Sequence, residues 1–230
     1  MKSPSRSVLI TGATRGIGRE LARQLHAEGF RVFATGRDAD QLAALQQELG
    51  CPGEPADLGT AEAALALYAA AHRALGRVDV LINNAGFNLA KQPIEALTPE
   101  ALDASYALNV RAPILLAREA FKEMGPRRSG HIVNVLSSVV HMKPANYAIY
   151  ATMKHALHGF TGCLLREAQA LGVKVTAVYP GGVNTTFRAQ PRPDYLQPAS
   201  AARMIVQCLT APDDVVVHEL TYRPMVETNF

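Results

Sequence analysis

The stretch YAIYATMK, residues 147–154, places two tyrosines and one lysine at spacings that could serve proton transfer. If the stretch is helical, Tyr150 and Lys154 are four positions apart and leave the same face of the helix. A nearby ammonium group favours the phenolate form of tyrosine, which is otherwise scarce at neutral pH because a phenol has a pKa of about 10. Tyr150 is therefore a candidate general acid and base with Lys154 as its electrostatic partner, although such pairs also occur by chance on helix surfaces. Tyr147 is expected in the pocket wall or at the start of the helix.

A glycine-rich stretch, TGATRGIG at residues 11–18, follows a short apolar run and opens an amphipathic segment. An open parallel sheet binds phosphate at such a turn, because backbone N–H groups and the helix dipole favour an anion there. Gly12, Gly16 and Gly18 permit positive φ angles and close approach of a ligand to the backbone. The spacing differs from the common G-x-G-x-x-G pattern, so an ordinary strand-to-helix turn remains the alternative.

The residues after the second expected strand indicate which nucleotide such a turn would bind. A NAD site usually has an acidic residue there, which accepts hydrogen bonds from the ribose hydroxyls. This chain has Gly36 and Arg37 instead, and Arg15 lies inside the glycine turn. Because guanidinium groups pair with phosphate, the pattern predicts NADP(H) rather than NAD(H). The alternative is that Arg37 and Asp38 only begin the next helix in solvent.

Strand patterns alternate with helical patterns along the chain. Strands are expected at residues 8–11, 31–35, 78–82, 131–136, 174–178 and 215–220. Helices are expected at residues 16–28, 39–49, 60–75, 99–107, 110–124, 147–171 and 199–209. The alternation predicts an α/β protein whose parallel sheet is covered by helices on both faces. We expect a single domain over residues 1–230, because no linker or longer repeat divides the chain.

Composition and charge exclude several classes of protein. Apolar residues make up 48% of the 230 residues and charged residues 19%, which is typical of a globular protein and not of a disordered one. The net charge of +3 comes without any run of Lys and Arg, so no nucleic-acid partner is expected. The three cysteines lack metal-ligand spacing, so we expect reduced thiols and no metal site. The first apolar run is too short for a signal peptide or membrane span, which predicts a cytoplasmic protein without a membrane partner.

Six motifs occur in a fixed order between residues 11 and 185. They are TGATRGIG at 11–18, NNAG at 83–86, Asn109 within LNV, Ser137 and Ser138, YATMK at 150–154 and PGGVNT at 180–185. Together they resemble the short-chain dehydrogenase/reductase family. The resemblance implies a single-domain, three-layer Rossmann fold with a doubly wound, seven-stranded parallel sheet. It also implies hydride transfer between NADP(H) and a carbonyl/alcohol pair.

The resemblance also implies a role for each matching position. The expected cofactor-binding residues are Gly12, Thr14, Arg15, Gly16, Ile17, Gly18, Arg37, Asp57, Leu58, Asn83, Ala85, Gly86, Tyr150, Lys154, Pro180, Gly181, Val183 and Thr185. The expected catalytic residues are Asn109, Ser138, Tyr150 and Lys154, with Asn109 holding a water that links the lysine to solvent. From the residues alone, Asn83 and Asn84 could instead form a turn, and Asp57 could cap the following helix.

The choice between the two adjacent serines depends on which feature is given more weight. Ser137 has the usual separation of thirteen residues from Tyr150, whereas Ser138 matches the motif context of SSVV after IVNVL. Neighbours on a strand face opposite sides, so only one of them can point into a cleft. We expect Ser138 to be the active serine, with a one-residue deletion in the loop at residues 141–146.

The substrate is expected to be a small carbonyl or alcohol compound bound beneath a lid at about residues 185–198. Its pocket would be formed by Phe87, Asn88, Val139, His141, Met142, Tyr147, Phe187 and the lid. His141 could narrow the site or lie on the loop surface, and Arg188 and Arg192 could steer an anion or be solvated. The alternatives are a 3-oxoacyl-thioester reductase and a non-catalytic NADP(H)-binding regulator. The resemblance implies a homodimer or homotetramer.

Overall fold

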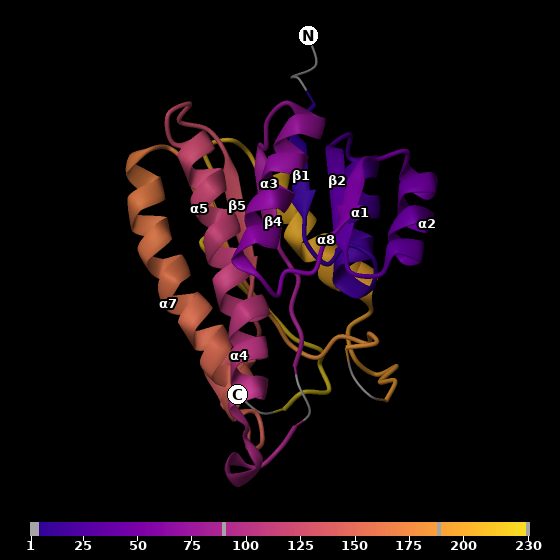
Figure 1. The fold of residues 1–230 in the computed structure, drawn as a ribbon, viewed down its shortest axis with the longest axis vertical. Coiled ribbons are helices and arrows are strands. Elements are labelled where there is room, and N and C mark those ends of the chain that lie inside the picture. The colour runs from indigo at the N-terminus through magenta and orange to yellow at the C-terminus, as the bar shows by residue number, and fades with distance from the viewer. Residues whose placement is uncertain (1–4, 89–90, 188–189, 229–230) are drawn as a thin grey trace.

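The computed structural model describes residues 5–88, 91–187 and 190–228, which form a seven-stranded parallel sheet between two layers of helices (Figure 1). The strands lie in the order β3-β2-β1-β4-β5-β6-β7. Their bounds are β1 Ser7–Ile10, β2 Arg31–Gly36, β3 Gly53–Pro55, β4 Val80–Asn83, β5 His131–Val135, β6 Lys174–Pro180 and β7 Glu219–Tyr222. Strand β1 pairs with β2 on one side and with β4 on the other. The carboxyl ends of β1 and β4 therefore flank a topological switch point, where open α/β sheets bind ligands.

Each face of the sheet has its own hydrophobic core. On one face, Val8 and Ile10 pack with residues of α1 Gly16–Ala27, α2 Ala39–Leu49 and α8 Pro198–Leu209. On the other face, Leu9 packs with residues of α3 Ala61–Leu75, α5 Ala112–Met124 and α7 Ala148–Ala170. Successive residues of β1 thus enter opposite cores, as the alternation of side chains along a strand requires. The Rossmann fold expected from the sequence is confirmed.

Local sequence explains where several helices begin and end. The side chains of Asp38, Thr60 and Thr98 each accept a hydrogen bond from a backbone N–H three residues later, at the starts of α2, α3 and α4 Pro99–Tyr106. Such caps satisfy N–H groups that have no partner inside the helix. Gly50 and Gly76 end α2 and α3 in the left-handed conformation, which glycine adopts without strain. These helices therefore have well-defined ends that the sequence itself specifies.

The helices expected at 99–107 and 110–124 exist, but no loop separates them. Residues Ala107–Arg111 form a π-helical turn that joins α4 to α5. Such turns are rare and are often found at functional sites. Two further short elements, a 3-10 turn at Ile94–Ala96 and helix α6 at Val139–Met142, lie in segments that the hydrophobic pattern left unassigned.

The sheet differs from expectation at both edges. The last strand is Glu219–Tyr222, not 215–220, because β7 pairs with the carboxyl half of β6, with Leu220 opposite Val178. The apolar residues at 215–217 lie in the connection instead, where the backbone N–H of Val215 donates to the carbonyl of Pro212. At the other edge, β3 has the sequence Gly-Glu-Pro and carries no apolar pattern that could have predicted a strand.

Two further properties concern the chain as a whole. The helices within the described residues are too short or too polar to cross a membrane. Cys51, Cys163 and Cys208 are free thiols, two of them buried and Cys163 exposed.

Candidate active site

The glycine turn follows β1 and is held by its own backbone and by Asn84. Gly12 and Gly16 have φ angles of +64° and +54°, the left-handed region that favours glycine. A Cβ atom on Gly18 would overlap the carbonyl oxygen of Gly12. The Asn84 amide donates to the carbonyls of Thr11 and Gly12 at 2.9 and 3.2 Å. Glycine at these positions is therefore a requirement of the turn.

The start of α1 is left open toward ligands. Its N-cap residue, Arg15, makes no side-chain hydrogen bond to the first turn, unlike the capping residues of α2, α3 and α4. The N–H groups of that turn and the positive end of the helix dipole are thus available to an anion. At the end of β2, Thr14 packs so closely on Gly36 that a side chain at position 36 would overlap it. The Thr14 side chain therefore fills the space between the glycine turn and the end of β2.

A single cleft of about 960 Å³ extends from this turn across the carboxyl ends of the strands. The expected cofactor residues that line it are Gly12, Thr14, Arg15, Gly16, Ile17, Gly18, Arg37, Leu58, Ala85, Gly86, Tyr150, Lys154, Pro180, Gly181, Val183 and Thr185. Asp57 and Asn83 do not line it, and neither do Ser138 and Asn109. The sequence therefore predicted the position of the cleft, although these four expected residues do not line it.

Asn83 does not face the cleft as expected. Its side chain is buried and its amide donates to the carbonyl of Pro113 at 3.1 Å and to the Asn134 side chain at 2.9 Å. Asn84, the next residue, lines the cleft instead. Adjacent residues at a strand end point to opposite sides, so the pair divides into one interior and one cleft residue.

Asp57 is also placed differently from the expectation. It is exposed, its carboxylate accepts from the backbone N–H of Gly59 at 3.1 Å, and its neighbours Ala56 and Leu58 line the cleft. It does not cap α3 either, because Thr60 occupies that position. Leu58 therefore reaches the cleft and Asp57 forms a local turn.

Directly after β2, Arg37 lines the cleft, and Asp38 does not compete with it for a ligand. The Asp38 carboxylate accepts from the backbone and the side-chain amide of Gln41, at 3.0 and 2.7 Å, and so caps α2. A carboxylate engaged in a cap is less available to ribose hydroxyls, whereas the Arg37 guanidinium has no ion-pair partner among the described residues. This end of the cleft therefore presents positive charge.

Tyr150 and Lys154 meet on one face of α7, as their spacing predicts. The Lys154 Nζ lies 5.6 Å from the centroid of the Tyr150 ring and donates to the carbonyl of Val135 at 3.0 Å. Both side chains are buried at the cleft wall. Burial lowers the pKa of Lys154 to about 8, because the charged ammonium is removed from water. The lysine therefore stays largely protonated at neutral pH while being close to its titration range.

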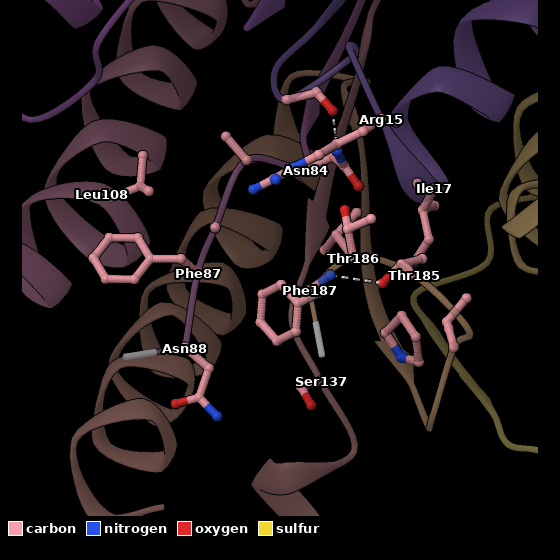
Figure 2. Close-up of a pocket in the computed structure, with 18 of the residues that line it drawn as sticks. Arg15, Ile17, Asn84, Phe87, Asn88, Leu108, Ser137, Thr185, Thr186 and Phe187 are labelled. Atoms are coloured by element: carbon pink, nitrogen blue, oxygen red, sulfur yellow. Dashed lines mark hydrogen bonds between the residues drawn. The ribbon is translucent and has the colours of Figure 1, made fainter. Parts of the chain in front are cut away.

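The structure places Ser137, not Ser138, on the cleft. Ser137 is a lining residue, and Figure 2 shows it near Phe187, with Asn88 and Phe87 farther across the cleft. Ser138 is buried, and its backbone N–H donates to the carbonyl of Pro180 at 2.9 Å. The expectation that Ser138 faces the cleft is therefore wrong. The separation of thirteen residues was the better signal, and no deletion in the loop is needed.

Asn109 lies in the π-helical turn, completely buried behind the cleft. Its amide nitrogen donates to the carbonyls of Phe87 and Ser105, each at 3.1 Å, while its Oδ1 has no protein partner. A Cβ on Gly86 would lie 2.9 Å from this Oδ1 and 3.5 Å from the Lys154 Nζ. Glycine at position 86 thus keeps space open beside a buried acceptor and a buried donor.

A second glycine turn, at Gly181 and Gly182, follows β6, and Gly181 lines the cleft. The backbone N–H of Gly182 donates to Glu227 Oε1 at 3.1 Å, and Glu227 Oε2 accepts from Arg223 Nε at the same distance. Both side chains of this ion pair are largely buried, with exposed fractions of 8% and 14%. A Cβ on Gly182 would overlap the ring of Tyr195. This turn is therefore packed between the C-terminal segment and the loop that follows it.

That loop contains the expected lid. Val183 bridges Leu196, and the backbone N–H of Arg192 donates to the Asn184 side chain at 2.9 Å, so the loop folds back on itself. The Phe187 ring lies 6.0 Å from the Tyr150 ring. Arg188, one of the two expected charges, lies outside the described residues. The loop thus brings an aromatic side chain over the Tyr150 end of the cleft.

The expected substrate pocket is formed in part. Phe87, Asn88, Tyr147 and Phe187 line the cleft, whereas Val139, Met142 and His141 do not. The His141 ring packs 4.9 Å from the buried ring of Tyr179 instead. Thr186 and Gln190 of the expected lid also line the cleft, as do Lys91 and Leu108, which carry no motif.

Similarity to known proteins gives the family of the chain. A family model described as short chain dehydrogenase matches residues 6–196. The chain belongs to the short-chain dehydrogenase family. It is 32% identical to an uncharacterized oxidoreductase of Staphylococcus aureus over 94% of this chain and 96% of that one. The match covers nearly all of both proteins, so the chain is an oxidoreductase of this family.

Solved structures of short-chain dehydrogenases share its fold. The closed form of a serine dehydrogenase complexed with NADP+ has a TM-score of 0.87 and 26% identity, covering 95% of this chain and 94% of that chain. A variant of the actinorhodin polyketide ketoreductase with NADPH has a TM-score of 0.86 and 30% identity, covering 94% and 95% of the two chains. The similarity therefore extends over the whole fold.

Proposed function

We propose that this short-chain dehydrogenase uses NADP(H) to reduce an aldehyde or ketone to an alcohol, reversibly. The observation that carries the proposal is the position of Tyr150 on the cleft wall, with the buried Lys154 ammonium 5.6 Å from its ring. A phenol beside a fixed positive charge can give a proton to a carbonyl oxygen and take it back from an alcohol. The other end of the same cleft has the features of a nucleotide site.

The residues of the cleft fit NADP(H). The glycine turn and the uncapped start of α1 would hold its pyrophosphate, and Arg37 and Arg15 would hold the 2′-phosphate. The Asp38 carboxylate, which would repel that phosphate, is occupied with Gln41. The related serine dehydrogenase and ketoreductase structures contain NADP+ and NADPH. When bound, the cofactor supplies a hydride to the carbonyl carbon.

Tyr150 and Lys154 would handle the proton. In reduction, the Tyr150 hydroxyl donates its proton to the substrate oxygen, and the Lys154 ammonium stabilises the phenolate that results. The Lys154 pKa of about 8 leaves it mostly charged at neutral pH and able to pass a proton on. The unpartnered Oδ1 of Asn109 and the space beside Gly86 suit a bridging water next to this lysine. Replacement of the proton on Tyr150 would follow this route.

Ser137 would orient the substrate carbonyl. The backbone N–H of Val139 donates to the Ser137 hydroxyl oxygen at 3.2 Å, which occupies one acceptor position. The hydroxyl proton remains able to donate to a carbonyl oxygen in the cleft. A hydrogen bond there stabilises the negative charge that develops on this oxygen as hydride arrives.

The direct test compares Tyr150→Phe with Tyr147→Phe, because the two phenols line the same cleft. Oxidation of NADPH with a panel of aldehydes and ketones should fall by about 1000-fold or more in Tyr150→Phe, as expected when a general acid is removed. NADPH binding should change little in either variant, and Tyr147→Phe should keep most of its activity. Full activity in Tyr150→Phe would refute the mechanism. Tight NADPH binding by the wild type without turnover of any carbonyl would favour a regulator.

The choice between Ser137 and Ser138 can be tested with two separate variants. Ser137→Ala should lower kcat far more than Ser138→Ala, and the reverse result would restore Ser138 as the active serine.

The ratio of kcat/KM for NADPH to that for NADH should exceed one in the wild type and fall in Arg37→Ala, because the variant loses a partner for the 2′-phosphate. A wild-type ratio below one would refute the NADP(H) preference.

A further inference from the structure

The Tyr150 end of the cleft combines apolar walls with side chains that can donate hydrogen bonds. The apolar and aromatic surface comes from Phe87, Tyr147 and Phe187. The donors are Asn88, Lys91, Gln190 and Arg192, while Asp38 is the one acidic side chain among the described residues that line the cleft. Asp38 lies at the opposite end, where it caps α2. We propose that the carbonyl substrate carries a carboxylate group and that Lys91 binds it, an inference that rests on the proposed carbonyl reduction.

Lys91 is an exposed residue of the cleft lining, and its ammonium contacts an aromatic ring. Its Nζ lies 4.9 Å from the centroid of the Tyr147 ring, a cation–π contact. The Tyr147 ring lies 6.5 Å from the Tyr150 ring. The next residue, Gln92, donates its backbone N–H to the carbonyl of Asn146 at 3.2 Å, which ties this segment to the start of α7. The Tyr147 ring therefore lies next to both the Lys91 ammonium and the ring of the proposed proton donor.

The charge of Lys91 is not neutralised within the described part of the chain. Arg192, the other cation at this end, forms a two-point ion pair with Asp194 at 3.0 and 2.8 Å and stacks on Tyr195 at 4.1 Å. No carboxylate of the described residues pairs in this way with Lys91. One unpaired cation beside an apolar wall attracts a monoanion by Coulomb interaction, and the wall contacts the apolar part of the same ligand. A phosphate dianion would call for more cations or backbone donors than this end provides.

This arrangement assigns a specificity role to Lys91 and leaves the chemical step unchanged. The carboxylate would lie near Lys91 while the carbonyl carbon and oxygen lie near Tyr150 and Ser137. The aromatic side chains would contact the part of the substrate that joins the two groups. The substrate class is therefore an oxo acid or an aldehyde acid in reduction, and the corresponding hydroxy acid in oxidation.

The test uses three aldehydes that differ only in the group opposite the carbonyl: 4-formylbenzoate, its neutral methyl ester and 4-formylphenyl phosphate. With NADPH, the wild type should show a kcat/KM for 4-formylbenzoate about 10-fold or more above that for the ester, corresponding to about 1.4 kcal/mol. Lys91→Gln should remove this preference, chiefly by raising KM for the acid, and should leave the ester nearly unaffected. Lys143→Gln is the matched control, because Lys143 is exposed and lies outside the cleft lining.

The outcomes separate this inference from the proposed function. Equal use of the acid and the ester, or an equal loss for both in Lys91→Gln, would overturn the role of Lys91 while leaving carbonyl reduction intact. A clear preference for the phosphate would overturn the choice of carboxylate. An equal effect of Lys143→Gln would show general electrostatic steering instead of a contact and would also overturn it. If the protein reduces none of the three aldehydes and no other carbonyl compound, the proposed function itself is refuted.

Discussion

The two glycine turns that line the cleft are supported in different ways. The turn at residues 11–18 is held by the positive φ angles of its glycines and by contacts of its backbone with itself and with Asn84. The turn at Gly181 and Gly182 is held by side chains, namely Glu227 and Arg223 from the C-terminal segment and Tyr195 from the following loop. The first turn is thus held mainly by its backbone and by Asn84 from the end of β4, whereas the second is held by side chains that follow it in the sequence.

This difference predicts how each turn should respond to substitution. A backbone oxygen cannot move away from an added methyl group without breaking the turn, but a side chain can change rotamer. The first turn should therefore respond to substitution in an all-or-none manner. The turn at Gly181 and Gly182 should lose activity gradually. A compensating substitution in a neighbouring side chain should restore part of the lost activity.

Among substitutions in the two glycine turns, the largest effect is expected from Gly18→Ala. The added Cβ would overlap the carbonyl oxygen of Gly12, so the turn must open and its N–H groups lose their alignment. NADPH affinity should fall by about 100-fold or more, or about 2.7 kcal/mol, measured by calorimetry. Gly159→Ala in α7 is the control, since nothing lies within 4 Å of the added atom and alanine favours a helix. Normal affinity in Gly18→Ala would contradict the backbone account of this turn.

Lys154 lines the cleft outside the two glycine turns. Its buried charge should lower the free energy of unfolding of the protein. Burial lowers its pKa from 10.5 to about 8, so between these values the unfolded chain binds more protons and stability increases with pH. Below about pH 8 the folded protein bears the cost of a buried charge, on the order of 3 kcal/mol. Lys154→Met should therefore be more stable than the wild type at pH 7, although inactive.

Urea unfolding at pH 7 and at pH 9.5, without cofactor, measures this difference. The advantage of Lys154→Met should shrink at the higher pH, where the wild-type lysine is neutral in the folded state. An advantage that is independent of pH would show that packing, and not charge, is the cause. A variant less stable than the wild type at pH 7 would show that the hydrogen bond to Val135 outweighs the cost of burial.

A smaller and reversible defect is expected from Gly182→Ala. Its Cβ would overlap the Tyr195 ring, which is a side chain and can be replaced. The value of kcat/KM should fall by about 10-fold, or about 1.4 kcal/mol, and Tyr195→Leu in the same chain should recover part of the loss. If the double variant is as impaired as the single one, the turn at Gly181 and Gly182 is as rigid as the turn at residues 11–18.

The smallest effect is expected from Glu227→Gln. The amide oxygen can still accept from the N–H of Gly182, but the ion pair with Arg223 is lost. A loss of about 3-fold in kcat/KM with NADPH is expected, and Glu227→Ala should lose more because no acceptor remains. Glu167→Gln, on the exposed face of α7, is the control. No difference between the two Glu227 variants would show that Gly182 does not need this acceptor.

The features that the sequence predicted are those with a local cause. The glycine turn follows from the types of residue at 11–18, and the approach of Tyr150 to Lys154 follows from helix geometry. The alternation of strand and helix patterns predicted the sheet, except for β3, which has no apolar pattern, and β7, whose register depends on pairing with β6.

The features that the sequence did not predict depend on side-chain direction or on distant partners. Asn83 and Asn84 exchange roles because adjacent residues face opposite sides, and the parity cannot be read from the motif alone. The same applies to Ser137 and Ser138. Lys91 carries no motif, and its proximity to Tyr147 arises only when the segment after β4 meets the start of α7.

The support of Gly182 by Glu227 has a consequence for biosynthesis. A ribosome makes the chain from its N-terminus, so residues 11–18 can adopt their turn long before residue 227 exists. The wall formed by Gly181 and Gly182 must wait for β7 to join the sheet edge and for Arg223 and Glu227 to pack behind it. The reaction site is therefore complete only when the last strand, β7, has docked against β6.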